Sequence, residues 1–187
     1  MGWYMVKCKK LFRKRREQGL TLIEASMVLA LSAVVVAGVM LYYQSASDNN
    51  RLQSALGELG SIQTAVQTLY AGQSDYTNLS NVVLKGNSSI PPSMQDATTG
   101  DLKNPWNGAV TVAVDAVKTN YDVTFEGIPV GACAAFASQQ LGSQMVSISV
   151  NGATTPSTTP LSPSDAQTAC NTGAAANGLA KIEWVLK

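Results

Sequence analysis

The chain has 187 residues, with 13 basic and 12 acidic side chains and no histidine. Without histidine, catalytic triads built on imidazole and the usual zinc ligand sets are excluded. The sequence also has no glycine-rich phosphate loop and no pair of acids with catalytic spacing. We therefore expect a protein that is not an enzyme and that binds no cofactor or metal.

Basic residues are concentrated at the N-terminal end. Residues 1–19 hold seven of the bases and one acid, and an apolar stretch from Ala25 to Tyr43 follows, which Leu20 to Ile23 extend. At 1.5 Å per residue, Ala25 to Tyr43 is about 28 Å long as a helix, nearly the thickness of a bilayer core. The pattern predicts a membrane helix whose basic flank stays on the cytoplasmic side.

One acid, Glu24, lies within this apolar region. A charged carboxylate in hydrocarbon costs roughly 2.5 to 3.5 kcal/mol, so Glu24 needs a partner. A cut between Gly19 and Leu20 would create a free α-amine of opposite charge. Within one helix that amine and Glu24 stand at positions i and i+4, on one face. An amine of a neighbouring copy would serve equally well, and only that arrangement builds a polymer.

The segment Gly19-Leu20-Thr21-Leu22-Ile23-Glu24, preceded by a basic leader, resembles the processing site of type IV prepilins. The long leader and the leucine after the cut are similar to the type IVb branch of enteric bacteria. The runs Ala30 to Ala33 and Ala37 to Asp48 resemble the major subunits of bundle-forming pili.

The resemblance implies an α+β type IV pilin fold, in which a long N-terminal helix packs against an antiparallel β-sheet head. It implies that a prepilin peptidase cleaves between Gly19 and Leu20 and methylates Leu20, and that Leu20 and Glu24 mediate subunit assembly. The implied partners are further copies of the chain in a helical filament, an assembly platform with an ATPase and an outer-membrane secretin, and a periplasmic disulfide oxidase. The precursor would lie in the inner membrane with its head in the periplasm, and the fibre would be extracellular.

The implied function is that of the major subunit of a pilus for bacterial aggregation, microcolony formation and host-cell adherence. Four alternatives stay open: a thin-pilus subunit for conjugative mating contact, a minor pilin, a secretion-system pseudopilin, and a monomeric binding protein on a signal anchor. A cleaved secretory signal is disfavoured because the apolar run ends in Tyr42-Tyr43-Gln44, a poor cleavage site.

Removing the leader changes the charge and the cysteine count. The remaining chain has six bases and eleven acids, a net side-chain charge of −5, which argues against direct nucleic-acid binding. The basic cluster of the leader could be a nucleic-acid patch, but its place beside a membrane segment favours orientation of that segment. Cys8 leaves with the leader, and Cys133 and Cys170 remain. In a chain that faces the periplasm this pair predicts a disulfide, and two buried thiols are the alternative.

Beyond a polar break at residues 44–50, apolar residues recur at helical spacing, which predicts that the helix continues to about Tyr70 with one face on the head. Arg51, Glu58 and Gln67 are expected to face outward or to meet neighbours. The apolar positions are Leu52, Ala55, Leu56, Leu59, Ile62, Val66, Leu69 and Tyr70.

The rest of the chain predicts the head. Residues 71–107 are expected to form a long connecting region that ends in the turn Asn104 to Gly108, with Trp106 as a core anchor. The predicted elements that follow are strands at 110–114 and 121–125, a helix at 130–141, a strand at 145–150, an exposed loop at 152–163, a helix from Ser162, and a last strand at 179–186. A central place in the sheet is one option for the last strand, and Asp115, Asp122 and Glu126 are expected to face solvent.

We therefore divide the chain into a leader at 1–19, a long helix at 20–72 whose residues 20–43 form the membrane anchor and filament core, and an α+β head at 73–187.

Overall fold

The computed structural model describes residues 21–96, 98–174 and 177–187. Helix α1 runs from Leu22 to Tyr70. The chain divides into two units between Tyr43 and Gln44, and α1 contributes residues to both. The helix predicted to end near Tyr70 does end there, without a proline or a break along its length.

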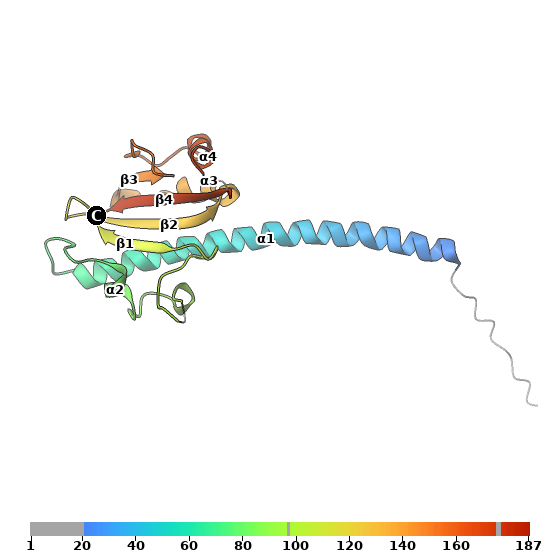
Figure 1. Ribbon diagram of the computed structural model, residues 1–187, viewed down its shortest axis with the longest axis horizontal. Coiled ribbons are helices and arrows are strands. Elements are labelled where there is room, and N and C mark those ends of the chain that lie inside the picture. Colours follow the sequence, from blue (N-terminus) through green and yellow to red (C-terminus); the bar gives the residue numbers. More distant parts are fainter. Residues whose placement is uncertain (1–20, 97, 175–176) are drawn as a thin grey trace, which may run out of the picture. The chain divides into compact units, whose positions relative to one another are not determined.

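The head, from Gln44 onward, contains a four-stranded antiparallel sheet (Figure 1). Its strands are β1 (Val110–Val114), β2 (Tyr121–Pro129), β3 (Met145–Val150) and β4 (Leu179–Leu186). They lie in the order β1-β2-β4-β3, so that the last strand of the chain is central. The predicted strands are confirmed, and β2 continues four residues beyond the predicted Phe125 to Pro129.

Alternation along the strands places the core on one face of the sheet. The register pairs Val123 with both Val112 and Trp184, and Trp184 with Ile148, so all four side chains share a face. All four are at most 1% exposed. Residues of α1 belong to the same core: Ala55, Leu59, Ile62, Ala65 and Val66. The second half of α1 therefore completes the core of the head.

Two further helices complete the head. Helix α3 (Val130–Ala137) contributes Phe136, whose ring centroid lies 4.9 Å from that of Trp184 and 5.2 Å from that of Phe125. This helix ends four residues before the predicted Leu141. Helix α4 (Pro163–Asn171) begins as predicted, because Ser162 accepts a hydrogen bond from the backbone N–H of Asp165.

The connecting region 71–107 is more ordered than the sequence predicted. It contains helix α2 (Asn81–Leu84) and a 3₁₀ turn, η1 (Pro92–Met94). The Asn81 amide donates to the carbonyl of Val110 and accepts from the N–H of Val112, at 2.8 and 2.7 Å. The side chain thereby occupies two backbone hydrogen-bonding groups of the edge strand β1, which hinders pairing with another chain at that edge.

Two predicted outward positions are corrected. Glu58 is only 7% exposed, because it lies on the packed side of α1 beside Leu59. Asp122 is half-buried rather than solvent-facing, and its Oδ1 has no hydrogen-bond partner in the described part of the chain. Leu69, predicted to pack on the head, is 41% exposed.

Candidate assembly site

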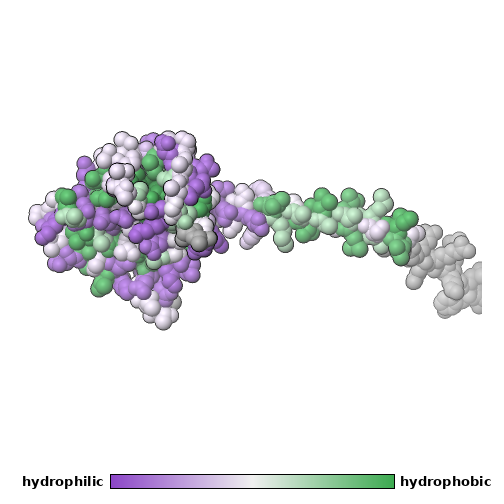
Figure 2. All heavy atoms as spheres, turned by 45° about the horizontal axis from the view of Figure 1, so that its top comes forward, coloured by the Kyte–Doolittle hydropathy of each residue, from purple (hydrophilic) through white to green (hydrophobic). Residues whose placement is uncertain are grey.

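The first part of α1, from Leu22 to Tyr43, exposes apolar side chains along its whole length. Figure 2 shows them as a hydrophobic stretch of the helix on the face in view. Exposure is high throughout, from 87% at Leu22 to 55% at Val36 and 73% at Tyr43. Monomeric soluble proteins rarely expose apolar patches larger than a few hundred square ångströms. This segment is long and apolar enough to cross a membrane. It therefore needs either lipid or other protein around it.

Both serines of this segment are hydrogen-bonded within its own helix. Ser26 Oγ donates to the carbonyl of Ile23 at 2.8 Å, and Ser32 Oγ donates to that of Val28 at 2.7 Å. Such hydroxyls leave no unsatisfied donor when the helix enters an apolar environment. Around Gly38 a Cβ would meet no atom within 4 Å, so a second helix can approach this small-residue surface closely.

Glu24 lies at the first turn of α1 and closes a capping box with Thr21. Its Oε2 accepts hydrogen bonds from the N–H and the hydroxyl of Thr21, each at 3.0 Å, and the Thr21 hydroxyl accepts from the N–H of Glu24 at 3.3 Å. No hydrogen bond to Oε1 is found within residues 21–96, 98–174 and 177–187. The carboxylate is thus held in place through one oxygen, which leaves the second oxygen for a cation.

Of the residues predicted for processing and assembly, the structure describes only Glu24. Gly19 and Leu20, predicted for cleavage, methylation and assembly, lie outside the described residues. Glu24 lies at the start of α1, as an acid on an otherwise apolar surface. The role of Thr21 was missed, although the sequence carries its signal: Thr21-Leu22-Ile23-Glu24 has the spacing of a capping box.

The disulfide region belongs to the head. Cys133 of α3 and Cys170 of α4 form a disulfide, with their Cα atoms 6.0 Å apart. Both cysteines are fully buried. The bond joins residues 37 apart in sequence and holds the two helices together.

A second acid of α1 is buried in the head. Burial raises the pKa of Glu58 to about 7, and its Oε2 has no hydrogen-bond partner among the residues described. Burial also raises the pKa of Asp122 to about 6, and the nearby charges of Asp115 and Glu183 add to this effect. Neither carboxyl was a candidate site, since the sequence pattern predicted exposure for both.

Comparison with known proteins shows the family of the chain. Residues 44–187 match the family model Bundlin, and residues 14–40 match the prokaryotic N-terminal methylation motif. The chain is 40% identical over 144 residues to the major structural subunit of the bundle-forming pilus of Escherichia coli O127:H6. The aligned residues cover 76% of this chain and 75% of that protein. The chain belongs to the bundlin family. It is a type IVb pilin, as the resemblance in its N-terminal region predicted.

More distant type IV pilins show the same fold. The toxin coregulated pilin of Vibrio cholerae is 32% identical over 97 residues, 51% of this chain and 43% of that protein. The crystal structure of a type IV pilin from Vibrio cholerae El Tor biotype aligns with a TM-score of 0.52 at 13% identity, over 74% of this pilin and 99% of that chain. The predicted α+β pilin fold is confirmed, with its long N-terminal helix and antiparallel sheet.

Proposed function

We propose that this pilin is the major subunit of a type IVb pilus and polymerises into surface fibres for bacterial aggregation, microcolony formation and host-cell adherence. The observation that carries the proposal is the apolar half of α1, which is exposed from Leu22 to Tyr43 and carries a single acid, Glu24. The chain's 40% identity over 144 residues to the major structural subunit of a bundle-forming pilus supports the same role.

The apolar half of α1 serves in two environments. In the precursor it anchors the chain in the inner membrane, with the head in the periplasm, where an oxidase forms the disulfide. In the fibre, neighbouring helices replace lipid around it. Since one apolar environment replaces another, the transfer requires little free energy, and helix packing contributes to it.

Glu24 supplies the specificity of assembly. A prepilin peptidase cuts between Gly19 and Leu20 and methylates the new amine, which pairs with Glu24 of an adjoining subunit. The capping box supports this role, because it fixes the carboxylate through Oε2 and leaves Oε1 for the amine. An assembly platform with an ATPase and an outer-membrane secretin would extend the fibre to the cell surface.

Fibres sheared from cells test the proposal. Mass spectrometry of these fibres should find this chain as the principal protein, beginning at an N-methylated Leu20. Chains that begin at Met1 in cells with active prepilin peptidase would contradict pilin biogenesis. Fibres composed chiefly of another subunit would instead make this chain a minor pilin or a pseudopilin.

A further inference from the structure

The head contains a cavity of about 240 Å³ where its part of α1 begins. This volume is far above the roughly 10 to 15 Å³ that one water molecule needs, so a small side chain can enter it. Most of its wall is apolar, and its acid is Asp48 on α1. The lining residues are Asp48, Asn49, Leu52, Trp106, Pro129, Gly131, Ala132 and Ala135.

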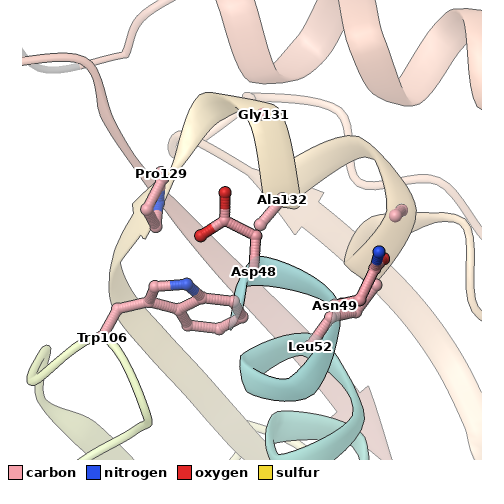
Figure 3. A pocket seen from close by; sticks show the side chains of 8 residues that line it. Asp48, Asn49, Leu52, Trp106, Pro129, Gly131 and Ala132 are labelled. Carbon is pink, nitrogen blue, oxygen red and sulfur yellow. The ribbon is translucent and has the colours of Figure 1, made fainter. Parts of the chain in front are cut away.

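Figure 3 shows the Asp48 carboxylate between the Trp106 indole and the first turn of α3. Asp48 makes no ion pair within the described part of the chain, and Arg51, three residues further along α1, is not bonded to it. The buried Nε1 of Trp106 also has no hydrogen-bond partner among the described residues. The cavity therefore has a largely apolar wall, with the exposed Asp48 carboxylate at its edge making no ion pair among the described residues.

The local sequence holds Trp106 in this position. Asn104, only 4% exposed, accepts hydrogen bonds from the N–H groups of Trp106 and Gly108 and donates to the carbonyl of Glu126 at 2.7 Å. Gly108 cannot be replaced without moving β2, because a Cβ there would lie 1.8 Å from the Glu126 oxygen. The wall of the cavity is thus rigidly supported by the sheet.

The opposite end of the head carries a complementary feature, the turn between β1 and β2. Here Val117, 56% exposed, precedes the exposed Lys118. The Asp115 carboxylate accepts from the N–H groups of Ala116 and Val117, and the Lys118 carbonyl accepts from the N–H of Tyr76 at 2.8 Å. The turn is braced at its base and presents an apolar and a cationic side chain.

Charge pairing within the described residues leaves few cations for Asp48. Lys85, Lys103 and Lys181 pair with Asp101, Asp96 and Glu126. Arg51, Lys118 and Lys187 make no ion pair in the residues that the structure describes. The pKa of Asp75 is lowered chiefly by hydrogen bonds from Thr77, and the Lys118 charge adds to this effect. Arg51 lies near the cavity itself. Among the unpaired cations that the structure describes, Lys118 and Lys187 remain, and Lys118 follows the exposed Val117 in a braced turn.

We propose that the Val117–Lys118 turn of one subunit docks into the Asp48 cavity of a second copy of this chain. Val117 would contact the apolar wall, and the Lys118 ammonium would meet the Asp48 carboxylate. The two features lie at opposite ends of the head: Asp48 and Tyr70 are about 33 Å apart along α1, and the turn is bonded beside the end of that helix. A contact between different patches on successive copies is heterologous, and it builds an open filament when the rotation between copies does not close into a ring. The inference rests on the proposed function and names a contact between heads within that fibre.

Charge reversal tests the pairing in cells that export the full chain. Asp48→Lys and Lys118→Asp should each lower the yield of sheared fibres about tenfold, because each places like charges in the contact. Combining them should restore the yield to within about threefold of the original, since the reversed pair attracts again. Lys187→Asp removes an exposed cation elsewhere in the chain and should leave the yield unchanged. A double variant no better than either single variant would overturn the proposal, as would an equal loss from Lys187→Asp.

Cross-linking of the unaltered fibre provides a test that no folding defect can obscure. A carbodiimide joins a carboxylate and an ammonium in contact, and Asp48 and Lys118 of one head are too far apart to join. We expect a peptide pair joining Asp48 to Lys118 in fibres and not in detergent-dispersed monomers. Fibres in which Lys118 joins only other acids would refute the docking while leaving the proposed function intact. Cells whose fibres lack this chain would refute the proposed function itself.

Discussion

The two halves of α1 belong to one continuous helix, yet their side chains have opposite surroundings. From Leu22 to Tyr43 the apolar side chains are exposed, whereas from Ala55 to Val66 the apolar face is buried on the sheet of the same chain. Leu31 is 68% exposed and Leu59 is 1% exposed. The difference shows that the second half has its packing partner within the chain, and that the first half must obtain one from lipid or from other copies.

Removing the disulfide should have the largest effect on the head. We expect the double variant Cys133→Ser/Cys170→Ser to lose about 4 kcal/mol of unfolding free energy, because the bond restrains a chain segment of 36 residues in the unfolded state. Denaturant titration of the mature chain in detergent, followed by tryptophan fluorescence, measures this loss. Reduction of the unaltered protein should reproduce it, and an unchanged midpoint in both cases would show that the bond does not stabilise α3 against α4.

A matched pair of leucine substitutions tests the contrast between the halves directly. Leu59→Ala should lower the unfolding free energy of the head by about 3 kcal/mol, because it leaves a cavity in the core. Leu31→Ala should leave the head unchanged, since no residue of the head core depends on it. The same denaturant titration compares both variants. Equal losses would mean that the two halves of the helix are not independent in the dispersed monomer.

Substituting Glu24 should affect assembly and leave the head intact. We expect Glu24→Ala to lower the assembly constant roughly 30-fold, about 2 kcal/mol per subunit, because the Leu20 amine of a neighbour would lose its acid in an apolar environment. The yield of sheared fibres, normalised to the cleaved chain in membranes, measures this effect. Ser32→Ala is the control, since its hydroxyl binds only its own helix. Normal fibre yield from Glu24→Ala would contradict the proposed pairing.

The buried acid of the second half predicts a smaller, pH-dependent effect. The pKa of Glu58 is about 7 in the folded head, above its ordinary value of 4.5, so folding favours the protonated acid. Its contribution to stability is therefore complete below pH 4.5 and is lost as the pH rises toward 7. Glu58→Gln should remove this dependence and stabilise the head at pH 8 by about 1 to 2 kcal/mol.

Unfolding midpoints between pH 4 and 8 measure this dependence. Asp122→Asn is the comparison variant, because the pKa of Asp122 is also raised, to about 6. Its effect on stability therefore falls in the same pH range as that of Glu58. If the pH dependence of the midpoint survives in Glu58→Gln but vanishes in Asp122→Asn, its source is Asp122 of β2 and not Glu58 of α1.

Local patterns were enough to predict most elements of the head. Alternation located the strands, and the serine before Pro163 located the start of α4. Helix α2 was missed because its four residues, Asn81–Leu84, form no periodic pattern. In the structure its position is fixed by tertiary contacts: Leu84 is buried in the core, and Asn81 is hydrogen-bonded to the backbone of β1. Such tertiary contacts are not visible in a short segment.

Burial of polar residues was predicted least well. Glu58 stands next to Leu59 on a predicted helix, and because charged side chains are mostly exposed in folded proteins, it was predicted to face outward. The Asp48 cavity could not be predicted either, because its walls come from α1, the Trp106 turn and α3, which are distant in sequence. The assembly residues, in contrast, were predicted from a local signal: a basic leader, a cut site and one acid in an apolar run.

A helical reconstruction of the intact fibre would show directly what surrounds the apolar half of α1. Residues 22–43 of each subunit should be surrounded by the same segment of other subunits. Each Leu20 nitrogen should lie within hydrogen-bond distance, about 3 Å, of a Glu24 carboxylate of an adjoining copy. Fibres in which these segments do not contact one another, or in which Glu24 meets only its own chain, would contradict this arrangement.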